Sequence, residues 1–314
     1  MVTDEPVLWI NGRLGPASDA RLDPRDRGFT LGDGLFETMR VTGGVVPWLA
    51  IHLTRLRVGA AVIHLPLPWS DAELGEAVAR TLQAAGLRDG VVRLTVSRGT
   101  PKRRGLLPDA EPTPTAVIHA QPFPGYPAAL YGRGMTAIVS GIARNDRSPL
   151  ARIKTLSALD NVLARREAAE SGADEAILLN TVGGVVGASA ANIFLVLGGA
   201  LVTPDGASGV LAGVARRLAM NRLAPQLGLS AIERPIASTE LRAADEAFLT
   251  SALLGVMPLV ELDGVPVGDG KPGPITERLR AAMTRVWDDL ERAGPERWGR
   301  SIAQLCPNDA VNGS

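Results

Sequence analysis

The stretch Arg152-Ile153-Lys154-Thr155-Leu156 contains one of only three lysines in a chain of 314 residues. The other two are Lys102 and Lys271, and arginine supplies the rest of the basic side chains. Arginine keeps its proton at neutral pH, whereas a lysine can lose its proton when burial or a neighbouring cation lowers its pKa. Amine chemistry in this protein therefore has three candidate residues.

Lys154 is the best placed of the three. Lys102 lies in a run of cations within a loop rich in proline and glycine, and Lys271 lies in a predicted turn. Lys154 has apolar neighbours, Ile153 and Leu156, and it precedes an amphipathic helix that we expect over residues 157–171. On position alone, the pattern favours an ordinary lysine at the start of a helix.

The segments that follow Lys154 have a regular order. The expected helix has Asp160 in its first turn, a leucine stripe that includes Leu159 and Leu163, and a stop at Gly172. Residues 175–179 predict a buried strand, 180–184 a turn and 191–196 a second strand.

This order resembles the fold-type IV family of pyridoxal-phosphate enzymes. The matching pieces are Lys154-Thr155-Leu156, Asn161-Val162-Leu163-Ala164, residues 173–179 and Ser189-Ala190-Ala191-Asn192-Ile193-Phe194, and an N-terminal segment, residues 26–40, with glycines at 28, 32 and 34. The family includes D-amino-acid and branched-chain aminotransferases and aminodeoxychorismate lyase. The resemblance implies a two-domain α/β and α+β fold, with a small N-terminal α/β domain and a larger C-terminal domain that has a β-barrel-like core.

The same resemblance implies where the cofactor, pyridoxal 5'-phosphate, is held. Lys154 becomes the Schiff-base lysine. Arg55, in a His-x-x-Arg-Leu pattern on a helix expected over residues 48–61, becomes a phosphate ligand, because a guanidinium fork suits paired phosphate oxygens. Composition alone makes Arg55 a solvated charge. The other implied cofactor contacts are Gly187, Ser189, Ala190, Asn192, Gly213, Val214, Ala215, Thr250, Ser251 and Ala252.

Two of these contacts have a physical reason of their own. Residues 213–215 begin a predicted helix, where free amides suit a phosphate. Thr250 and Ser251 end a predicted strand with hydroxyl groups, which fit either a phosphate contact or simple capping of the strand end.

The substrate side of the site rests on the family resemblance. Phe36, Arg98 and Arg103 are the implied substrate contacts, and Thr38 stands where the lyase has a functional threonine. Register favours Arg103 over Arg98 as the group that binds the substrate carboxylate. The loop that carries both arginines is also typical of a solvated loop, and Gly105 stands where D-amino-acid aminotransferases have a histidine.

One family residue is missing. The glutamate that partners the pyridine nitrogen falls at position 187, where this chain has glycine. A carboxylate there favours the protonated ring, which withdraws electrons from the substrate. Its absence predicts slow transamination and a smaller effect on an elimination reaction.

Smaller signs distinguish the family members. Leu159 stands where branched-chain aminotransferases have a tyrosine, which argues against them. Residues 213–216 and 251–258 look like the lyase, whereas residues 259–264 look like D-amino-acid aminotransferase. We expect an aminodeoxychorismate lyase-like enzyme that releases pyruvate to give 4-aminobenzoate. The alternatives are a D-amino-acid or other small amino-acid aminotransferase, and a degenerate cofactor-binding homologue with low activity.

Composition limits the partners. The net charge is zero, so we expect no nucleic acid. A single cysteine, Cys306, and three scattered histidines predict neither a disulfide nor a metal site. No apolar run reaches the length of a membrane span, and the N-terminus lacks a signal-peptide core, so we expect no membrane contact and a soluble, cytoplasmic protein. The resemblance implies a homodimer that acts on a small-molecule amino substrate.

The chain divides most naturally at its proline-rich stretch, residues 121–127. We expect an N-terminal domain over 1–120, a linker over 121–134, a cofactor-binding domain over 135–292 and a polar tail over 293–314. Within the first domain, Ser70-Asp71-Ala72-Glu73 has the pattern of a capping box before a helix that stops at Gly86.

Overall fold

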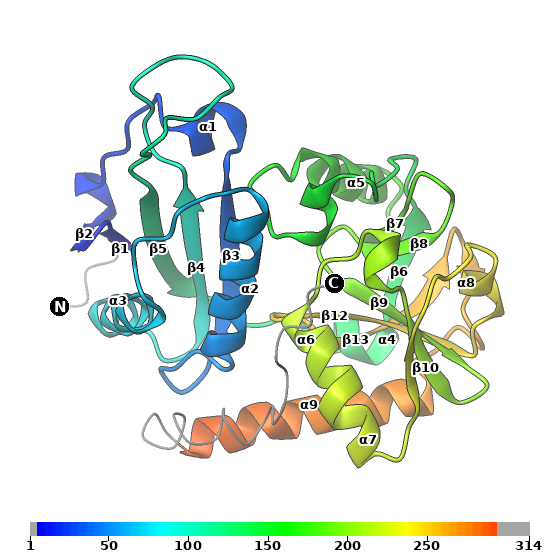
Figure 1. Cartoon of the computed structure of the whole chain (residues 1–314). Helices are drawn as coiled ribbons and strands as arrows, with labels where there is room; N and C mark the ends of the chain where they lie inside the picture. Colours follow the sequence, from blue (N-terminus) through cyan, green and yellow to red (C-terminus); the bar gives the residue numbers. More distant parts are fainter. Residues whose placement is uncertain (1–4, 294–314) are drawn as a thin grey trace.

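The computed structural model describes residues 5–293, and these form two β-sheets with helices packed on them (Figure 1). The predicted polar tail falls outside the described residues except for residue 293, which ends the last helix. Among the described residues, no helix combines the length and the hydropathy needed to cross a membrane. The two-domain fold expected from the sequence is confirmed.

The first sheet is antiparallel, with the strand order β2-β1-β5-β4-β3. Its strands are β1 (Val7–Ile10), β2 (Arg13–Pro16), β3 (Gly34–Val41), β4 (Gly90–Ser97) and β5 (Thr115–Pro122). Its helical segments are η1 (Ala17–Asp19), α1 (Arg27–Leu31), α2 (Leu49–Val62) and α3 (Asp71–Ala84). The turn between β1 and β2 uses Asn11 and Gly12 at φ 47° and 95°, as a tight hairpin requires.

Strand β3 separates two environments, because successive side chains of a strand point to opposite faces. Leu35 and Met39 enter the core beneath α2 and α3, together with residues such as Leu53 and Leu74. Phe36 and Thr38 are only partly buried, and they line a cavity on the other face, between the two sheets.

The second sheet is mixed and has the order β11-β10-β9-β12-β13-β6-β7-β8, with β14 beside β13. Its strands are β6 (Met135–Val139), β7 (Glu175–Leu179), β8 (Val185–Ala188), β9 (Asn192–Leu197), β10 (Ala200–Thr203), β11 (Ala231–Glu233), β12 (Glu246–Ser251), β13 (Gly255–Leu262) and β14 (Val265–Pro266). The sheet curls until β8, at one end of the path, contacts β9. This curl gives the barrel-like core that the family resemblance implies.

Helices surround this second sheet. They are α4 (Ala128–Arg133), η2 (Pro149–Arg152), α5 (Leu159–Glu170), η3 (Gly206–Ser208), α6 (Val214–Leu218), the π-helical η4 (Ala219–Leu223), α7 (Ala224–Gln226), α8 (Glu240–Ala243) and α9 (Pro274–Ala293). Figure 1 shows α9 running beneath the second sheet toward the first. Between the helices and the sheet, the rings of Phe194 and Phe248 stack 4.8 Å apart in a fully buried core.

The predicted linker has regular structure over much of its length. Gln121 and Pro122 complete β5, so the strand runs two residues beyond the predicted end at Ala120, and residues 128–133 form α4. The proposed division into domains remains a prediction.

The leucine stripe of α5 does not face the core. Leu159 and Leu163 are 68% and 42% exposed, whereas Ala164 and Ala168 are fully buried against β7. The small alanine side chains let the helix lie close to the strand, and it is their face, not the leucine stripe, that packs inward. These leucines are instead part of an exposed apolar surface.

The predicted capping box at the start of α3 is confirmed, and it generates a stability prediction. The Ser70 hydroxyl accepts a hydrogen bond from the Glu73 amide at 3.2 Å, and the Glu73 carboxylate accepts one from the Ser70 amide at 2.7 Å. We expect Ser70→Ala to lower the free energy of unfolding by about 1 kcal/mol in urea titrations. Ser70→Thr keeps the acceptor oxygen and should recover most of the loss, and equal losses for the two variants would contradict a capping role.

Candidate functional site

A cavity of about 570 Å³ lies between the two sheets. This volume falls within the roughly 300–1,000 Å³ that is typical of small-molecule sites. It is lined by most of the residues that the sequence singled out. These are Phe36, Thr38, Arg55, Lys154, Gly187, Ser189, Ala190, Asn192, Gly213, Val214, Thr250, Ser251 and Ala252. Ala215 lines a separate cavity of about 10 Å³ instead.

Lys154 reaches the cavity from a segment that is hydrogen-bonded to the first sheet. The Phe36 amide donates to the Lys154 carbonyl, and the Leu156 amide donates to the Gly34 carbonyl, each at 2.9 Å. The Lys154 Nζ lies 4.3 Å from the centre of the Phe36 ring. The backbone of β3 thus fixes the lysine, although the two segments are more than a hundred residues apart in the sequence.

The Lys154 amine is easier to deprotonate than an ordinary lysine. Burial and, next, the Arg55 cation lower its pKa from 10.5 to about 8, although Glu37 opposes the shift. At pH 7 roughly a tenth of such amines are neutral, compared with about one in 3,000 at the ordinary value. A neutral amine is the form that attacks a carbonyl carbon, so this environment suits covalent amine chemistry.

A buried carboxylate orients the arginine beside the lysine. Glu37, on β3, accepts a hydrogen bond from Arg55 Nε at 2.8 Å and a second from Arg55 at its other oxygen. His52 Nδ1 lies 2.7 Å from the same carboxylate. Burial alone would raise the pKa of Glu37, but the bonds from Arg55 and His52 outweigh burial and lower the pKa to about 2. Burial lowers the pKa of His52, so its neutral ring donates to a charged carboxylate.

This arrangement leaves part of the Arg55 guanidinium available. One further N–H donates to the Ala212 carbonyl at 3.1 Å. A guanidinium carries five N–H groups, so two remain for an anion in the cavity. The Ala212 contact also brings Arg55 to the loop that precedes α6.

Asn192 positions that loop. Its amide donates to the Leu211 carbonyl at 2.9 Å, and a Cβ atom at position 213 would collide with the Asn192 oxygen. Gly213 therefore fits against Asn192 where a larger residue does not. The loop ends with the first amides of α6, at Val214 and Ala215, which have no acceptor within the helix.

Thr250 supplies an unpaired donor at the same end of the cavity. It is 1% exposed, and among the described residues its hydroxyl has no hydrogen-bond partner. A buried polar atom without a partner is rare in native structures, and this one faces a cavity that can supply an acceptor. The Thr250 hydroxyl, the free N–H groups of Arg55 and the amide of Val214 together fit a phosphate group.

The wall formed by α5, β7 and β8 is different in character. Gly187 pairs with Leu178 across β8 and β7, and no carboxylate stands at position 187. Arg144 and Asn161 line the cavity beside it. Glu175 also lines the cavity, but it accepts hydrogen bonds from the Ser189 hydroxyl and the Ala176 amide, and it lies 3.5 Å from Arg165.

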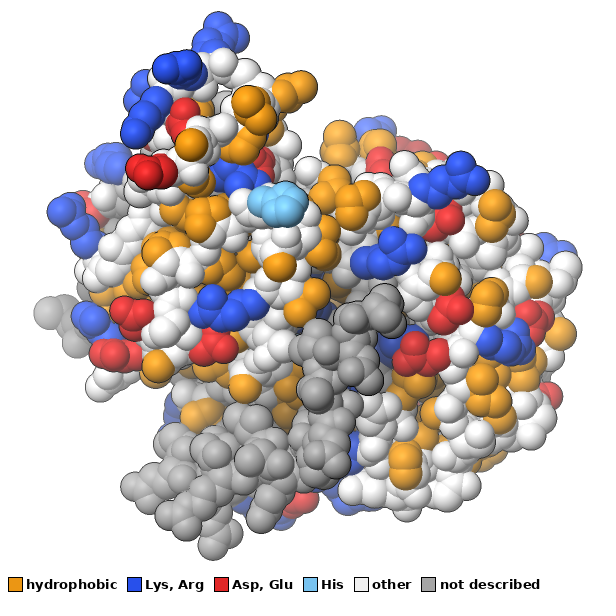
Figure 2. Space-filling model, in the orientation of Figure 1, with side chains coloured by type: hydrophobic (Ala, Val, Ile, Leu, Met, Phe, Trp, Pro, Cys, Tyr) orange, Lys and Arg blue, Asp and Glu red, His pale blue; other side chains and the backbone are white. Residues whose placement is uncertain are grey.

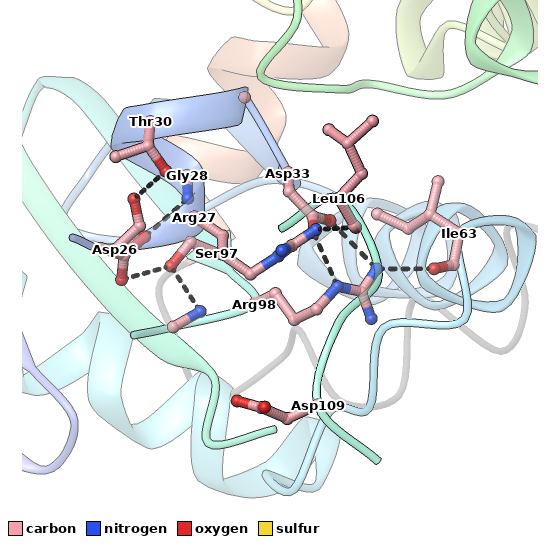
Figure 3. Close-up of polar contacts among 12 residues, drawn as sticks. Asp26, Arg27, Gly28, Thr30, Asp33, Ile63, Ser97, Arg98, Leu106 and Asp109 are labelled. Carbon is pink, nitrogen blue, oxygen red and sulfur yellow. Dashed lines mark hydrogen bonds and ion pairs between the residues drawn. The ribbon is translucent and has the colours of Figure 1, made fainter. Parts of the chain in front are cut away.

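Arg98 lies outside the cavity and has structural partners (Figure 3). Its guanidinium donates to Asp33 at 2.8 and 3.0 Å and to the carbonyls of Ile63 and His64 at 2.7 Å each. Arg27 shares Asp33 and also donates to the carbonyls of Gly105 and Leu106. Arg98 is thus part of a network that anchors the loop after β4, and it is not placed to bind a substrate in this chain's cavity.

Arg103 lies in that loop, exposed to solvent and outside the cavity of its own chain. The proposed roles of Arg103 in substrate binding and of Thr38 in catalysis remain predictions. Phe36 and Thr38 do line the cavity near Lys154, and the Phe36 ring also carries the Arg93 guanidinium 3.8 Å from its centre.

Sequence reasoning missed several residues of the cavity wall. They are His52, Tyr126, Arg144, Arg165 and Glu175, and it also missed Glu37, which lies behind the wall and binds His52 and Arg55. Asn161 belongs to a matched motif but was given no role. The arginines carried no signal, because arginine is abundant throughout the chain. Glu37 had one available clue, since an acid within an otherwise buried strand needs a cationic partner.

The residues present fit pyridoxal phosphate at two of its groups. Lys154 offers an amine of lowered pKa to the carbonyl carbon, and Arg55 with Thr250 offers donors to the phosphate. Position 187, where the family's acid would meet the ring nitrogen, is glycine, and the charged groups of the surrounding wall are Arg144, Arg165 and Glu175.

Comparison with known proteins agrees with this fit. The family model for amino-transferase class IV matches residues 34–262. A putative branched-chain-amino-acid aminotransferase of Methanocaldococcus jannaschii is 34% identical over 275 residues, which cover 87% of this chain and 93% of the relative. A D-alanine aminotransferase of Bacillus licheniformis is 32% identical over 276 residues, which cover 88% of this chain and 95% of the relative.

A solved structure is also similar over most of its length. The 4-amino-4-deoxychorismate lyase of Pseudomonas aeruginosa superposes with a TM-score of 0.78 and 35% identity, over 90% of this chain and 99% of that structure. The range matched by the family model includes Lys154, the Asn192 segment and the Thr250 strand. The chain therefore belongs to the class IV aminotransferase family and is an enzyme that depends on pyridoxal phosphate.

Proposed function

We propose that the protein is an aminodeoxychorismate lyase-like enzyme, which releases pyruvate to give 4-aminobenzoate. The observation that carries this proposal is Gly187 in the cavity wall, which leaves no acid at that position to partner a ring nitrogen. The 35% identity to the solved lyase supports the same activity. The expected cytoplasmic location stays a prediction.

Different residues of the cavity would bind the phosphate and transfer protons. Bound pyridoxal phosphate supplies a carbonyl carbon for amines and a ring that withdraws electrons from the substrate Cα. Arg55 and Thr250 hold the phosphate, so the reactive carbon faces the Lys154 amine. That amine, with a pKa of about 8, can accept a proton from the substrate and return it near neutral pH. Thr38 lies beside it on the cavity face of β3 and is the proposed second catalytic group.

The missing carboxylate favours elimination over transamination. An acid at position 187 would keep the nitrogen of bound cofactor protonated, which transamination needs because its electrons would have to stay on the ring. Elimination of the pyruvate group would need this acid less, because the electrons would leave with that group. A site without an acid at position 187 therefore hinders transamination more than elimination.

An aminotransferase is the second candidate. The similarity to a D-alanine aminotransferase and to a putative branched-chain-amino-acid aminotransferase favours it. The substrate would then be a small amino acid. In that case the cofactor ring would have to accept the electrons from the substrate without an acid at position 187.

We also propose a homodimer, because the chain exposes a large apolar surface. The α1–α5 surface consists of Phe29, Leu31, Leu106, Leu107, Leu159 and Val162, which are 44–89% exposed. Arg27 joins α1 to Leu106, and Ser157 bonds to Gly32, so these segments adjoin. Figure 2 shows hydrophobic side chains on both sides of the upper part of the cleft between the two sheets. Contiguous exposed apolar surface of this kind marks interaction sites.

The same surface gives Arg103 a role. It lies in the loop that carries Leu106 and Leu107, and it does not reach the cavity of its own chain. In a dimer formed through the α1–α5 surface, we propose that the loop lies at the partner's cavity, where Arg103 binds the substrate carboxylate.

The proposed activity predicts a clear outcome with purified enzyme. Aminodeoxychorismate should give 4-aminobenzoate and pyruvate without any amino acceptor, and D-alanine with 2-oxoglutarate should react far more slowly. Lys154→Ala should abolish the activity and the visible absorbance of lysine-bound cofactor, whereas Lys102→Ala should change neither. Fast D-alanine turnover without lyase activity would instead identify the aminotransferase, and a protein that binds the cofactor but is inert on both substrates would be the degenerate homologue.

Removal of Arg55 should weaken cofactor binding. Arg55→Ala deletes the phosphate donor and leaves Glu37 buried with only His52, so we expect a loss of roughly 2–5 kcal/mol in binding free energy. The matched control is Arg57→Ala on the same helix, because Arg57 pairs with the exposed Asp71 outside the cavity. Fluorescence titration of the apoprotein with cofactor measures both, and equal affinities would contradict the role of Arg55.

The oligomer is testable by light scattering. We expect the mass of two chains at micromolar concentration, and a shift toward one chain for Leu107→Glu, because a charge in the α1–α5 surface opposes its burial. Val265→Glu, on the β14 hairpin and also exposed, is the control and should leave the mass unchanged. A wild-type protein with the mass of one chain would refute the dimer and the proposed role of Arg103 in the partner's site.

A further inference from the structure

Arg144 is a cavity cation that the proposed mechanism does not use. It lines the cavity, and its guanidinium donates to the Asn161 side-chain oxygen at 3.0 Å and to the Ala151 carbonyl at 3.4 Å. Both acceptors are neutral. Burial lowers the pKa of Arg144, although Asp160 partly opposes this shift.

Most other guanidinium groups around the site have carboxylate partners, and Arg93, over the Phe36 ring, instead donates to the Thr95 hydroxyl. Arg55 is bonded to Glu37, Arg98 and Arg27 share Asp33, and Arg165 lies 3.5 Å from Glu175. Among the described residues, no ion pair includes Arg144. A partly buried cation without an anion is costly, so its free N–H groups favour an acceptor in the cavity.

Arg144 lies against the part of the wall that contains Gly187. The Arg144 amide donates to the Leu179 carbonyl on β7, next to Leu178, which pairs with Gly187 on β8. From the other side, the Asn161 amide donates to the Ser189 carbonyl at 2.6 Å, while the Asn161 oxygen accepts from Arg144. One side-chain amide therefore separates the guanidinium from the backbone two residues beyond Gly187.

The chemistry of the cofactor orients its ring toward this wall. The ring nitrogen is opposite the carbon that carries the carbonyl group, and the phosphate arm is next to that carbon. Lys154 would hold the carbonyl end beside Phe36 of the first sheet, and Thr250 and Arg55 would hold the phosphate end. The ring nitrogen would then point to the wall formed by α5, β7 and β8.

We propose that Arg144 takes the position of the missing acid, so that a guanidinium N–H donates to the ring nitrogen and keeps it unprotonated. A cation beside the nitrogen disfavours a second positive charge there, and its N–H needs the nitrogen lone pair as acceptor. Glu175, a carboxylate of the same wall, is held through its Oε1 atom, which accepts from the Ser189 hydroxyl and the Ala176 amide and lies 3.5 Å from Arg165. This inference rests on the proposed binding of the cofactor and specifies the kind of reaction that the site favours.

The direct test is the ¹⁵N NMR signal of cofactor labelled at the ring nitrogen and bound to the wild-type holoenzyme at pH 7.5. We expect the chemical shift of a hydrogen-bonded, unprotonated pyridine. A pyridinium shift in the wild type would overturn the proposal, whichever acid supplied the proton. Cofactor attachment at Lys154, checked by borohydride reduction and peptide mapping, tests the proposed function separately and does not depend on the state of the nitrogen.

Variants then assign the effect to Arg144. Arg144→Gln removes the charged donor, so the ¹⁵N chemical shift should differ from that of the wild type. Gly187→Glu adds an acid, so the shift should move to that of a pyridinium. Arg165→Gln is the matched control, because Arg165 lines the same cavity but neighbours Glu175, and it should leave the signal unchanged. If Arg144→Gln leaves the signal unchanged while Arg165→Gln moves it, Arg144 is not the partner of the nitrogen.

Discussion

The site depends on one buried carboxylate. Glu37 is fully buried on β3, and it stays charged only because Arg55 and His52 donate to it. This pairing holds the Arg55 guanidinium at the edge of the cavity with two N–H groups free. The same arginine, together with burial, lowers the pKa of Lys154. The phosphate donor and the reactive amine are therefore prepared by a single hydrogen-bonded group, which removal of any member would disturb.

A second group, Arg27, Asp33 and Arg98, works at the opposite end of β3 (Figure 3). It contributes no side chain to the cavity. Its effect is to fix the loop after β4 through the carbonyls of Gly105 and Leu106. The two clusters explain why two arginines that look alike in the sequence have different roles. Arg55 keeps two N–H groups that face the cavity, whereas Arg98 donates to a carboxylate and two backbone carbonyls.

Local patterns in the sequence predicted much of the fold and one part of the site. Alternation, turn residues and the Ser70 cap identify elements because they act over a few residues. Lys154 could be found because lysine is scarce and its neighbours are apolar. The roles of Arg144 and Glu37 could not be found this way, since they arise from contacts between strands and helices that only the folded chain brings together. The exposure of the leucine stripe of α5 could not be predicted for a related reason, because periodicity shows that a helix has an apolar face but not what covers it.

The attachment of the lysine segment to β3 has a further consequence. Strand β3 is an edge strand of the first sheet, and residues 154–156 extend that sheet through the bonds to Gly34 and Phe36 and the bridge between Leu35 and Thr155. Uncovered strand edges invite pairing with other chains. The segment that carries the reactive amine thus also shields this edge, so the first sheet on its own would be prone to aggregation. The hydrogen bonds between β3 and residues 154–156 position the lysine, and they also couple the folding of the first sheet to that of the segment that leads into the second.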